Sequence, residues 1–261
     1  MKLTQIQPQI DQIPRDFHGL LSDCCIFDSS CSPEARVLFI DKDSGYFLKK
    51  APKGALYQES IMTQYFHTRQ LAAEVLSYAS YEQDWLLTRR LSGEDCISQK
   101  YLDDPIRLCD TLAELLRRLH DENHDGCPVT DVTAQRLMLA QENYRMSRYD
   151  MSLFPDNWGF QSAEEAWATI ERNAKYLKTD TLLHGDYCLP NVLLDNWKFS
   201  GFIDVGGGGV GDRHFDLFWG IWTLFFNLKT NDYCDRFLNV YGRDLVDQDA
   251  LRTIAAIEVF G

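Results

Sequence analysis

The sequence predicts an α+β protein that has a strand-rich first third followed by a mainly helical remainder. Short segments rich in β-branched and aromatic residues dominate the first part, and amphipathic helical patterns dominate the second. The change falls at the polar stretch 89–95, so we expect an N-terminal lobe over 1–90 and a C-terminal lobe over 91–261. With 261 residues, 45% of them apolar, the chain is long enough to bury a core in each lobe.

Turn residues separate the predicted strands of the first part. The segments ARVLFI (35–40) and YFLK (46–49) flank the polar run 41–45, which is typical of two antiparallel strands joined by a turn. WLLT predicts another strand over 85–88. Apolar residues at helical spacing, without a strong breaker, predict a helix over 58–76.

The second part is predicted to contain several helices and one hairpin. Leucines recur on one face between residues 107 and 123 and predict a helix that faces the core. Asp195-Asn196 is a good hairpin turn between the strands 192–194 and 199–203. Further helices are expected over 134–149, 163–177, 215–228 and 247–259.

The formal charge limits the choice of partners. The chain has 26 Lys and Arg against 39 Asp and Glu, which gives 26 − 39 = −13. Nucleic-acid phosphates require basic surfaces, so we expect no nucleic-acid partner. A negative field attracts a small cationic ligand instead.

Composition also bears on the cellular compartment. No apolar run approaches the roughly 18 residues of a membrane helix, and the N-terminal residues lack the pattern of a signal peptide. The eight cysteines form no ligand-spaced pair, so we expect buried reduced thiols and no structural zinc. These features predict a cytoplasmic protein with no membrane partner. We expect the protein to be a monomer or a weak dimer.

The most informative stretch runs from His184 to Asn191, in the pattern H-G-D-x-x-x-x-N, and is followed by Asp204 at the end of a strand. Each polar residue alone is typical of an ordinary turn or cap. Together, the amide oxygen of Asn191 and the carboxylate of Asp204 can hold Mg²⁺ between nucleotide phosphates. Asp186 is then left to accept a proton from an attacking hydroxyl, as phosphoryl transfer requires.

Phosphoryl transfer of this kind predicts a lysine on an N-terminal strand, paired with a glutamate on the next helix. Lys49 and Glu59 satisfy this expectation, and the pair would direct the ammonium to the phosphates. Lys50 is the rival, but strand alternation turns it to the opposite face. No glycine-rich loop precedes the strand, so a hairpin tip at Ser32 is expected to cover the phosphates with backbone N–H groups.

These motifs resemble those of the aminoglycoside phosphotransferase family, most closely the 3′-phosphotransferases (kanamycin kinases), over nearly the whole chain. The resemblance implies a two-lobed protein-kinase-like fold, with a small antiparallel sheet in the N-lobe and a mainly helical C-lobe, and with ATP and Mg²⁺ as cofactors. It implies the following roles: Asp186 as catalytic base, Asn191 and Asp204 as metal ligands, Lys49 and Glu59 as phosphate clamp, Ser32 at the β-phosphate, and Phe47, Arg90 and Leu91 around adenine. The motifs that carry it are Cys31-Ser32-Pro33 through Arg36-Val37, His184 to Asn191, Ser200 to Asp204, Gly209 to Arg213 with Asp216, and Ile257 to Phe260.

The resemblance also implies a cationic substrate, an aminoglycoside antibiotic, whose amines are held by carboxylates of the C-lobe. Glu258 and Asp156 occupy the corresponding places near the end of the chain and in a helical insert. An ammonium group prefers a charge-assisted hydrogen bond to a carboxylate. Asp212 is expected to brace the loop around the metal ligand and not to contact the substrate.

Two departures from the family pattern leave alternatives open. In the family, the metal-binding aspartate usually begins the sequence Asp-x-Gly-Arg. This chain has Gly207 in place of that arginine. The loss of that guanidinium predicts reduced activity and keeps a weakly active nucleotide-binding relative as one alternative. The stretch 223–228 carries no carboxylate, which keeps a kinase for another small hydroxyl compound as a second alternative.

Overall fold

The computed structural model describes residues 3–31, 33, 35–151 and 158–261. The chain divides into two compact units. The first comprises Met1–Ser98 and Pro190–Gly206, and the second comprises Gln99–Leu189 and Gly207–Gly261. The first unit therefore includes residues 91–98 and 190–206, which the sequence-based lobe boundary at residue 90 placed with the second.

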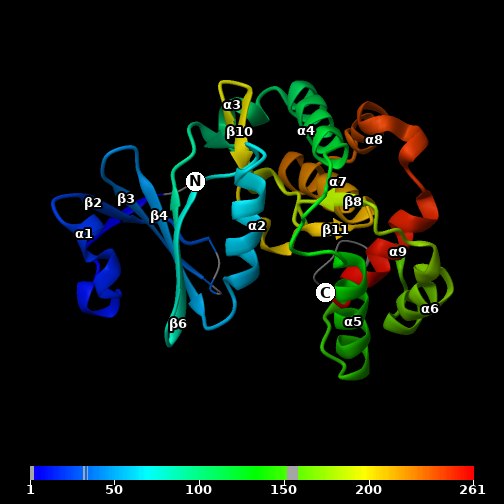
Figure 1. Cartoon of the computed structure of the whole chain (residues 1–261). Coiled ribbons are helices and arrows are strands. Elements are labelled where there is room, and N and C mark those ends of the chain that lie inside the picture. The colour runs from blue at the N-terminus through cyan, green and yellow to red at the C-terminus, as the bar shows by residue number, and fades with distance from the viewer. Residues whose placement is uncertain (1–2, 32, 34, 152–157) are drawn as a thin grey trace. The chain divides into compact units, whose positions relative to one another are not determined.

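A six-stranded antiparallel sheet forms the centre of the first unit (Figure 1). Long strands with β-branched and aromatic residues pair in its middle, as their composition predicts. Its strands, in spatial order, are β1 (Thr4–Ile6), β2 (Cys25–Asp28), β3 (Arg36–Asp41), β4 (Tyr46–Pro52), β6 (Gln83–Arg89) and β5 (Val75–Ser80).

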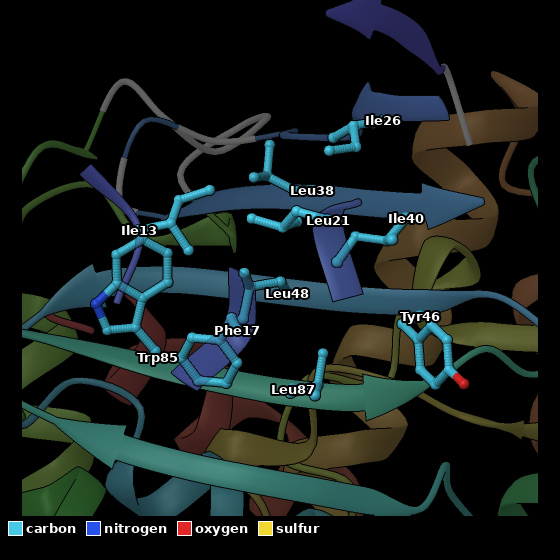
Figure 2. Close-up of a cluster of buried hydrophobic side chains, with 10 residues drawn as sticks. All are labelled: Ile13, Phe17, Leu21, Ile26, Leu38, Ile40, Tyr46, Leu48, Trp85 and Leu87. Atoms are coloured by element: carbon cyan, nitrogen blue, oxygen red, sulfur yellow. The ribbon is translucent and has the colours of Figure 1, made fainter. Parts of the chain in front are cut away.

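One face of this sheet is covered by the N-terminal segment. Ile13, Phe17 and Leu21, from the short helices η1 (Ile10–Gln12), η2 (Arg15–Phe17) and α1 (His18–Leu21) and their junctions, pack on alternate side chains of the strands (Figure 2). Leu48 and Trp85 are among these sheet side chains, both with less than a tenth of their surface exposed. Period-2 alternation therefore turns the neighbours Phe47 and Lys49 to the opposite face of the sheet.

On the opposite side, helix α2 (Tyr57–His67) contacts β5, and residues of α2 and of a three-stranded sheet line one cavity with side chains of this face. That sheet consists of β7 (Glu94–Asp95), β9 (Val192–Asp195) and β10 (Lys198–Phe202). The Phe202 N–H donates to Leu71 O at 2.7 Å, and the Cys96 N–H donates to Val192 O at 3.1 Å. These bonds explain why segment 190–206 belongs to the first unit.

The second unit is mainly helical, with one two-stranded sheet, β8 (Thr181–Leu183) paired with β11 (Gly209–Gly211). The leucine stripe of α4 (Pro105–His120) is buried as predicted, and Asp104 caps the helix by accepting from the Arg107 N–H. Helix α4 packs on α8, and α9 packs on α6 and α7. The other helices are α3 (Gln99–Leu102), α5 (Val132–Arg145), α6 (Ala163–Asn173), α7 (His214–Leu228), α8 (Cys234–Gly242) and α9 (Gln248–Glu258).

The sequence misplaced some boundaries. Helix α2 ends at His67, nine residues before the predicted end, because Gln70 adopts a positive φ of 60° and the chain turns there into β5. The hairpin turn between β9 and β10 consists of Asn196 and Trp197, both with positive φ, one residue later than predicted. The predictions named neither the helices α1, α3 and α8 nor the strands β1, β2, β5, β7, β8 and β11.

Two compositional expectations can be compared with this fold. Across the described segments, no helix combines the length and the apolar character needed to cross a membrane. All eight cysteines are free thiols, but only four of them are buried, whereas Cys25 and Cys31 are exposed.

Candidate functional site

A cavity of about 370 Å³ lies in the first unit, on the face of the sheet opposite the N-terminal segment. A volume of this order suits a small ligand such as a nucleotide base. Phe47 and Leu91 line this cavity, whereas Arg90 is not one of its described lining residues. The Arg90 N–H instead donates to Gly45 O at 3.0 Å, and its guanidinium lies over the Phe39 ring. Apolar lining comes from Val37, Ala51, Leu86, Leu193 and Phe202, among others.

Charged groups gather at one wall of this cavity. Lys49 Nζ lies 2.8 Å from Glu59 Oε2 and 2.6 Å from Asp204 Oδ1, and all three residues line the cavity. The predicted pairing of Lys49 with Glu59 is therefore present. Lys50, one residue on, turns to the other face and places its ammonium 5.2 Å from the centre of the Trp85 ring.

The environment of Lys49 keeps it charged. Burial alone would lower the pKa of the ammonium, but the carboxylates of Asp204 and Glu59 outweigh burial and raise it. The three groups together carry a net charge of −1 when both acids are ionised. In such a set, the lysine can leave a carboxylate to bind a phosphate, and the released carboxylate can bind a metal ion.

Backbone contacts fix the segment around Asp204. The Ile203 N–H donates to Asn191 O at 3.0 Å, which joins the two predicted metal ligands through adjacent backbone. Asp204 itself adopts a positive φ of 56°, and Gln58 of α2 donates to Gly206 O at 2.8 Å. Asn191 is buried, whereas the Asp204 side chain is about half exposed. The amide and carboxylate are hard oxygen donors, the type that Mg²⁺ binds, and phosphates and water would supply the rest of its shell.

In the second unit, a buried carboxylate holds the backbone of the His184–Asp186 loop. Asp216 of α7 accepts from the His184 N–H at 2.7 Å and from the Gly185 N–H at 2.8 Å. Gly185 has φ +86°, and a Cβ there would lie 2.0 Å from the Gly207 carbonyl, so only glycine fits. Asp186 follows this fixed turn and is the only residue of 181–189 that is not buried.

Asp216 is in turn supported by His120 of α4. His120 Nε2 lies 3.2 Å from Asp216 Oδ2, and His120 Nδ1 lies 2.8 Å from the Tyr241 hydroxyl. Complete burial lowers the pKa of His120, which favours the neutral ring that donates through Nε2 and accepts at Nδ1. Burial raises the pKa of Tyr241 to about 12, so its hydroxyl keeps its proton to donate.

Asp212 braces a different part of the second unit. It accepts from the Lys178 N–H at 2.7 Å and from His214 Nδ1 at 2.6 Å. The acid that holds the backbone of His184 and Gly185 is Asp216, which the sequence marked only as part of a motif. A signal existed, because a carboxylate within the apolar run of α7 must be buried and needs hydrogen-bond donors.

Glu258, at the end of α9, is buried, with 4% of its surface exposed. Its Oε1 lies 3.5 Å from Arg136 Nη1 and accepts no hydrogen bond from any described residue. Burial raises the pKa of this carboxyl, Arg136 opposes the shift, and the nearby Asp186 adds to it. Ser32 and Asp156, the other predicted contacts, lie outside the described residues.

Comparison with known proteins agrees with the fold. Residues 26–254 match the phosphotransferase enzyme family. The chain is 47% identical to a probable aminoglycoside 3′-phosphotransferase of Lactococcus lactis over 99% of both chains. It is 29% identical to an aminoglycoside 3′-phosphotransferase of Niallia circulans over 68% of this chain and 67% of the relative.

Solved structures share the architecture at low sequence identity. The crystal structure of an aminoglycoside 3′-phosphotransferase of type VIII superposes with a TM-score of 0.76 at 23% identity, covering 98% of this chain and all of the other. An aminoglycoside phosphotransferase from Streptomyces rimosus, in complex with ADP and streptomycin, gives 0.71 at 22% identity, covering 86% of this chain and 90% of that one. The predicted α+β, kinase-like class is thereby confirmed.

Proposed function

The chain belongs to the phosphotransferase enzyme family, and we propose that it transfers the γ-phosphate of ATP to a hydroxyl group of an aminoglycoside antibiotic. One observation carries this proposal. At the wall of a nucleotide-sized cavity, Lys49 Nζ is held between the carboxylates of Glu59 and Asp204. A fixed ammonium beside an apolar cavity suits a ligand with a flat apolar base and an anionic tail.

In this proposal the first unit binds the nucleotide. Adenine occupies the cavity against Phe47 and Leu91, with the backbone near Arg90 as its hydrogen-bond partner, and Lys49 binds the phosphates while Glu59 orients it. Ser32 covers the β-phosphate. The related Streptomyces rimosus structure, which contains ADP, supports the choice of an adenine nucleotide.

Asn191 and Asp204 are the proposed ligands of Mg²⁺. Mg²⁺ commonly uses one or two protein carboxylates or amides together with substrate phosphates, so two protein donors suffice. When bound, the ion neutralises negative charge on the phosphates. The hydrogen bond from the Ile203 N–H to Asn191 O keeps the segments that carry the two ligands together.

Asp186 of the second unit is the proposed catalytic base. It accepts the proton of the substrate hydroxyl while the hydroxyl oxygen bonds to the γ-phosphorus, and the bond from that phosphorus to the bridging oxygen breaks to release ADP. The fixed backbone of His184 and Gly185 supports this role, because a positioned carboxylate needs no reorganisation during the reaction.

The proposed acceptor is a polyamine drug. Glu258 supports this choice, because its buried Oε1 has hydrogen-bonding capacity to spare for a substrate ammonium. Asp156 is proposed as a second ammonium ligand. The formal charge of −13 would attract a cation at long range. We place the enzyme in the cytoplasm, where ATP is available and thiols stay reduced, as a monomer or weak dimer.

The test is an assay of ATP consumption and product mass with kanamycin, neomycin, a macrolide and choline as acceptors. We expect a phosphorylated product with kanamycin and neomycin, and a fall in kcat of about 10² to 10⁴-fold in Asp186→Asn. Asp232→Asn, at an exposed position, is the matched control. Transfer to none of these acceptors would contradict the proposal.

One observation favours a second candidate, a kinase for another small hydroxyl compound. The last turns of α7 present Trp222 stacked on Phe226, which is 48% exposed, and the stretch 223–228 has no carboxylate. An aromatic surface suits a less highly charged acceptor. Turnover with the macrolide or choline alone would favour this candidate.

A further inference from the structure

The Arg136 side chain of α5 reaches the loop that precedes Asp186. Its Nη2 donates to Gly185 O at 2.7 Å, and its Nη1 lies 3.5 Å from Glu258 Oε1. The guanidinium carbon lies 5.9 Å from the centre of the Phe215 ring, and the side chain is 23% exposed. A single guanidinium thus contacts the loop and its acidic neighbour.

Gly207 makes room for this arrangement. A Cβ at this position would lie 3.3 Å from Arg136 Nη2 and 3.2 Å from Gly185 O, both closer than ordinary contact. The φ of Gly207 lies outside the positive range, so space and not backbone conformation is what the position requires. A side chain at 207 would therefore begin in tight contact with both the guanidinium and the Gly185 carbonyl.

We propose that Arg136 is a positioning residue for Asp186, that it acts by holding the Gly185 carbonyl, and that Gly207 is its matched partner. This inference rests on the proposed function. Asp216, on α7, accepts hydrogen bonds from the N–H groups of the loop. Arg136, on α5, donates a hydrogen bond to the Gly185 carbonyl of the same loop. The peptide plane that leads into Asp186 is thereby fixed.

Arginine is the side chain that suits both contacts. Its planar fork can donate to a carbonyl with one nitrogen and face a carboxylate with another, whereas the lysine ammonium is a point charge. Glu258 acts as counter-ion to the guanidinium, and a substrate ammonium can approach the same carboxylate. Arg136 thus links the loop to the proposed acceptor site within the second unit.

The test is a double-mutant cycle between positions 136 and 207, with kanamycin and ATP as substrates. We expect Arg136→Ala to lower kcat about 10- to 100-fold, because a small misplacement of a reacting group costs that much, while KM for ATP changes less than about twofold. Gly207→Arg in the wild-type background should lower kcat, since two guanidinium groups would compete for one place. In the Arg136→Ala background the same substitution should raise kcat, because it returns a guanidinium next to Gly185. Arg145→Ala, an exposed arginine on the same helix, is the control.

Hydrogen exchange gives a readout that does not depend on turnover. We expect Arg136→Ala to speed amide exchange in the segment 183–188, with little change in β4, and Gly207→Arg to restore protection in the double variant. Equal losses from Gly207→Arg in both backgrounds, or unchanged exchange in Arg136→Ala, would overturn the inference. If the wild-type protein transfers phosphate to no acceptor, the proposed function fails, and the exchange data alone decide whether Arg136 holds the loop.

Discussion

The two units hold their functional groups by different means. In the first, Lys49, Glu59 and Asp204 contact one another through their side chains, at the wall of a cavity. In the second, Asp216 and Arg136 contact the backbone of the loop that carries Asp186. Ion pairs between side chains can rearrange when a ligand arrives, whereas backbone contacts fix a geometry beforehand. This difference suits the proposed roles, in which the first unit binds a charged nucleotide and the second positions a catalytic base.

The largest expected effect concerns the side-chain contacts of the first unit. Lys49→Met should lower kcat/KM for ATP about 100-fold or more, because it removes a fixed cation at the phosphates. Lys50→Met, on the opposite face of the same strand, should leave it within about twofold. Steady-state kinetics with varied ATP measure both. Similar losses in the two variants would mean that strand alternation does not select the functional lysine.

The second prediction concerns the backbone support. Asp216→Asn replaces one acceptor oxygen with a donor that faces a loop N–H group, so we expect the free energy of unfolding to fall by about 2 to 3 kcal/mol. Asp110→Asn, which breaks an exposed ion pair with Arg236, should cost under about 1 kcal/mol. Urea unfolding compares the two. Equal costs would show that Asp216 is no more important to stability than a surface acid.

Much of the fold could be predicted from local patterns. The leucine stripe of α4 and the alternation in β4 predict directly whether the segment is a helix or a strand and which of its faces is buried, because each pattern reflects burial of one face. The end of α2 could not be predicted, since it depends on a left-handed residue, Gln70, that nothing nearby in the sequence requires. The hairpin of 192–202 was found, but its pairing with β7 in the first unit is a long-range contact without a local signal.

For the candidate site, spacing identified the groups that would contact ligands but not their supports. The pairing of Lys49 with Glu59 follows from one strand and one helix. Arg136 is 49 residues from Gly185 in sequence, and only the folded chain brings them together. The sequence indicates Gly207 only as a lost guanidinium. The structure instead shows Gly207 packed against Gly185, with a guanidinium from α5 beside it.

The third prediction tests the acceptor end of the second unit. Glu258→Gln keeps the size of the side chain but removes its charge, so we expect KM for kanamycin to rise about tenfold through loss of one charge-assisted hydrogen bond. KM for ATP should stay unchanged. Glu171→Gln, at an exposed position on α6, is the control. An unchanged KM for kanamycin would remove Glu258 from the substrate site.

The smallest expected effect is a pH dependence that arises from His120. Burial lowers the pKa of His120 in the folded protein below its ordinary value of 6.5, despite the Asp216 carboxylate, which raises it. Below pH 6.5 the unfolded chain binds a proton that the folded ring does not, so stability falls as pH decreases through this range. Burial raises the pKa of Tyr241, which also faces the ring, so its hydroxyl keeps its proton between pH 5.5 and 7.5. The charge of Arg213 lowers the pKa of His120 further, and that of Asp121 raises it. Unfolding free energies across that interval should therefore fall less steeply in His120→Gln than in the wild type, with His124→Gln as the control. A steeper fall in His120→Gln would mean that the folded ring is protonated, and that Asp216 supports the loop as half of an ion pair and not as the acceptor of a neutral histidine.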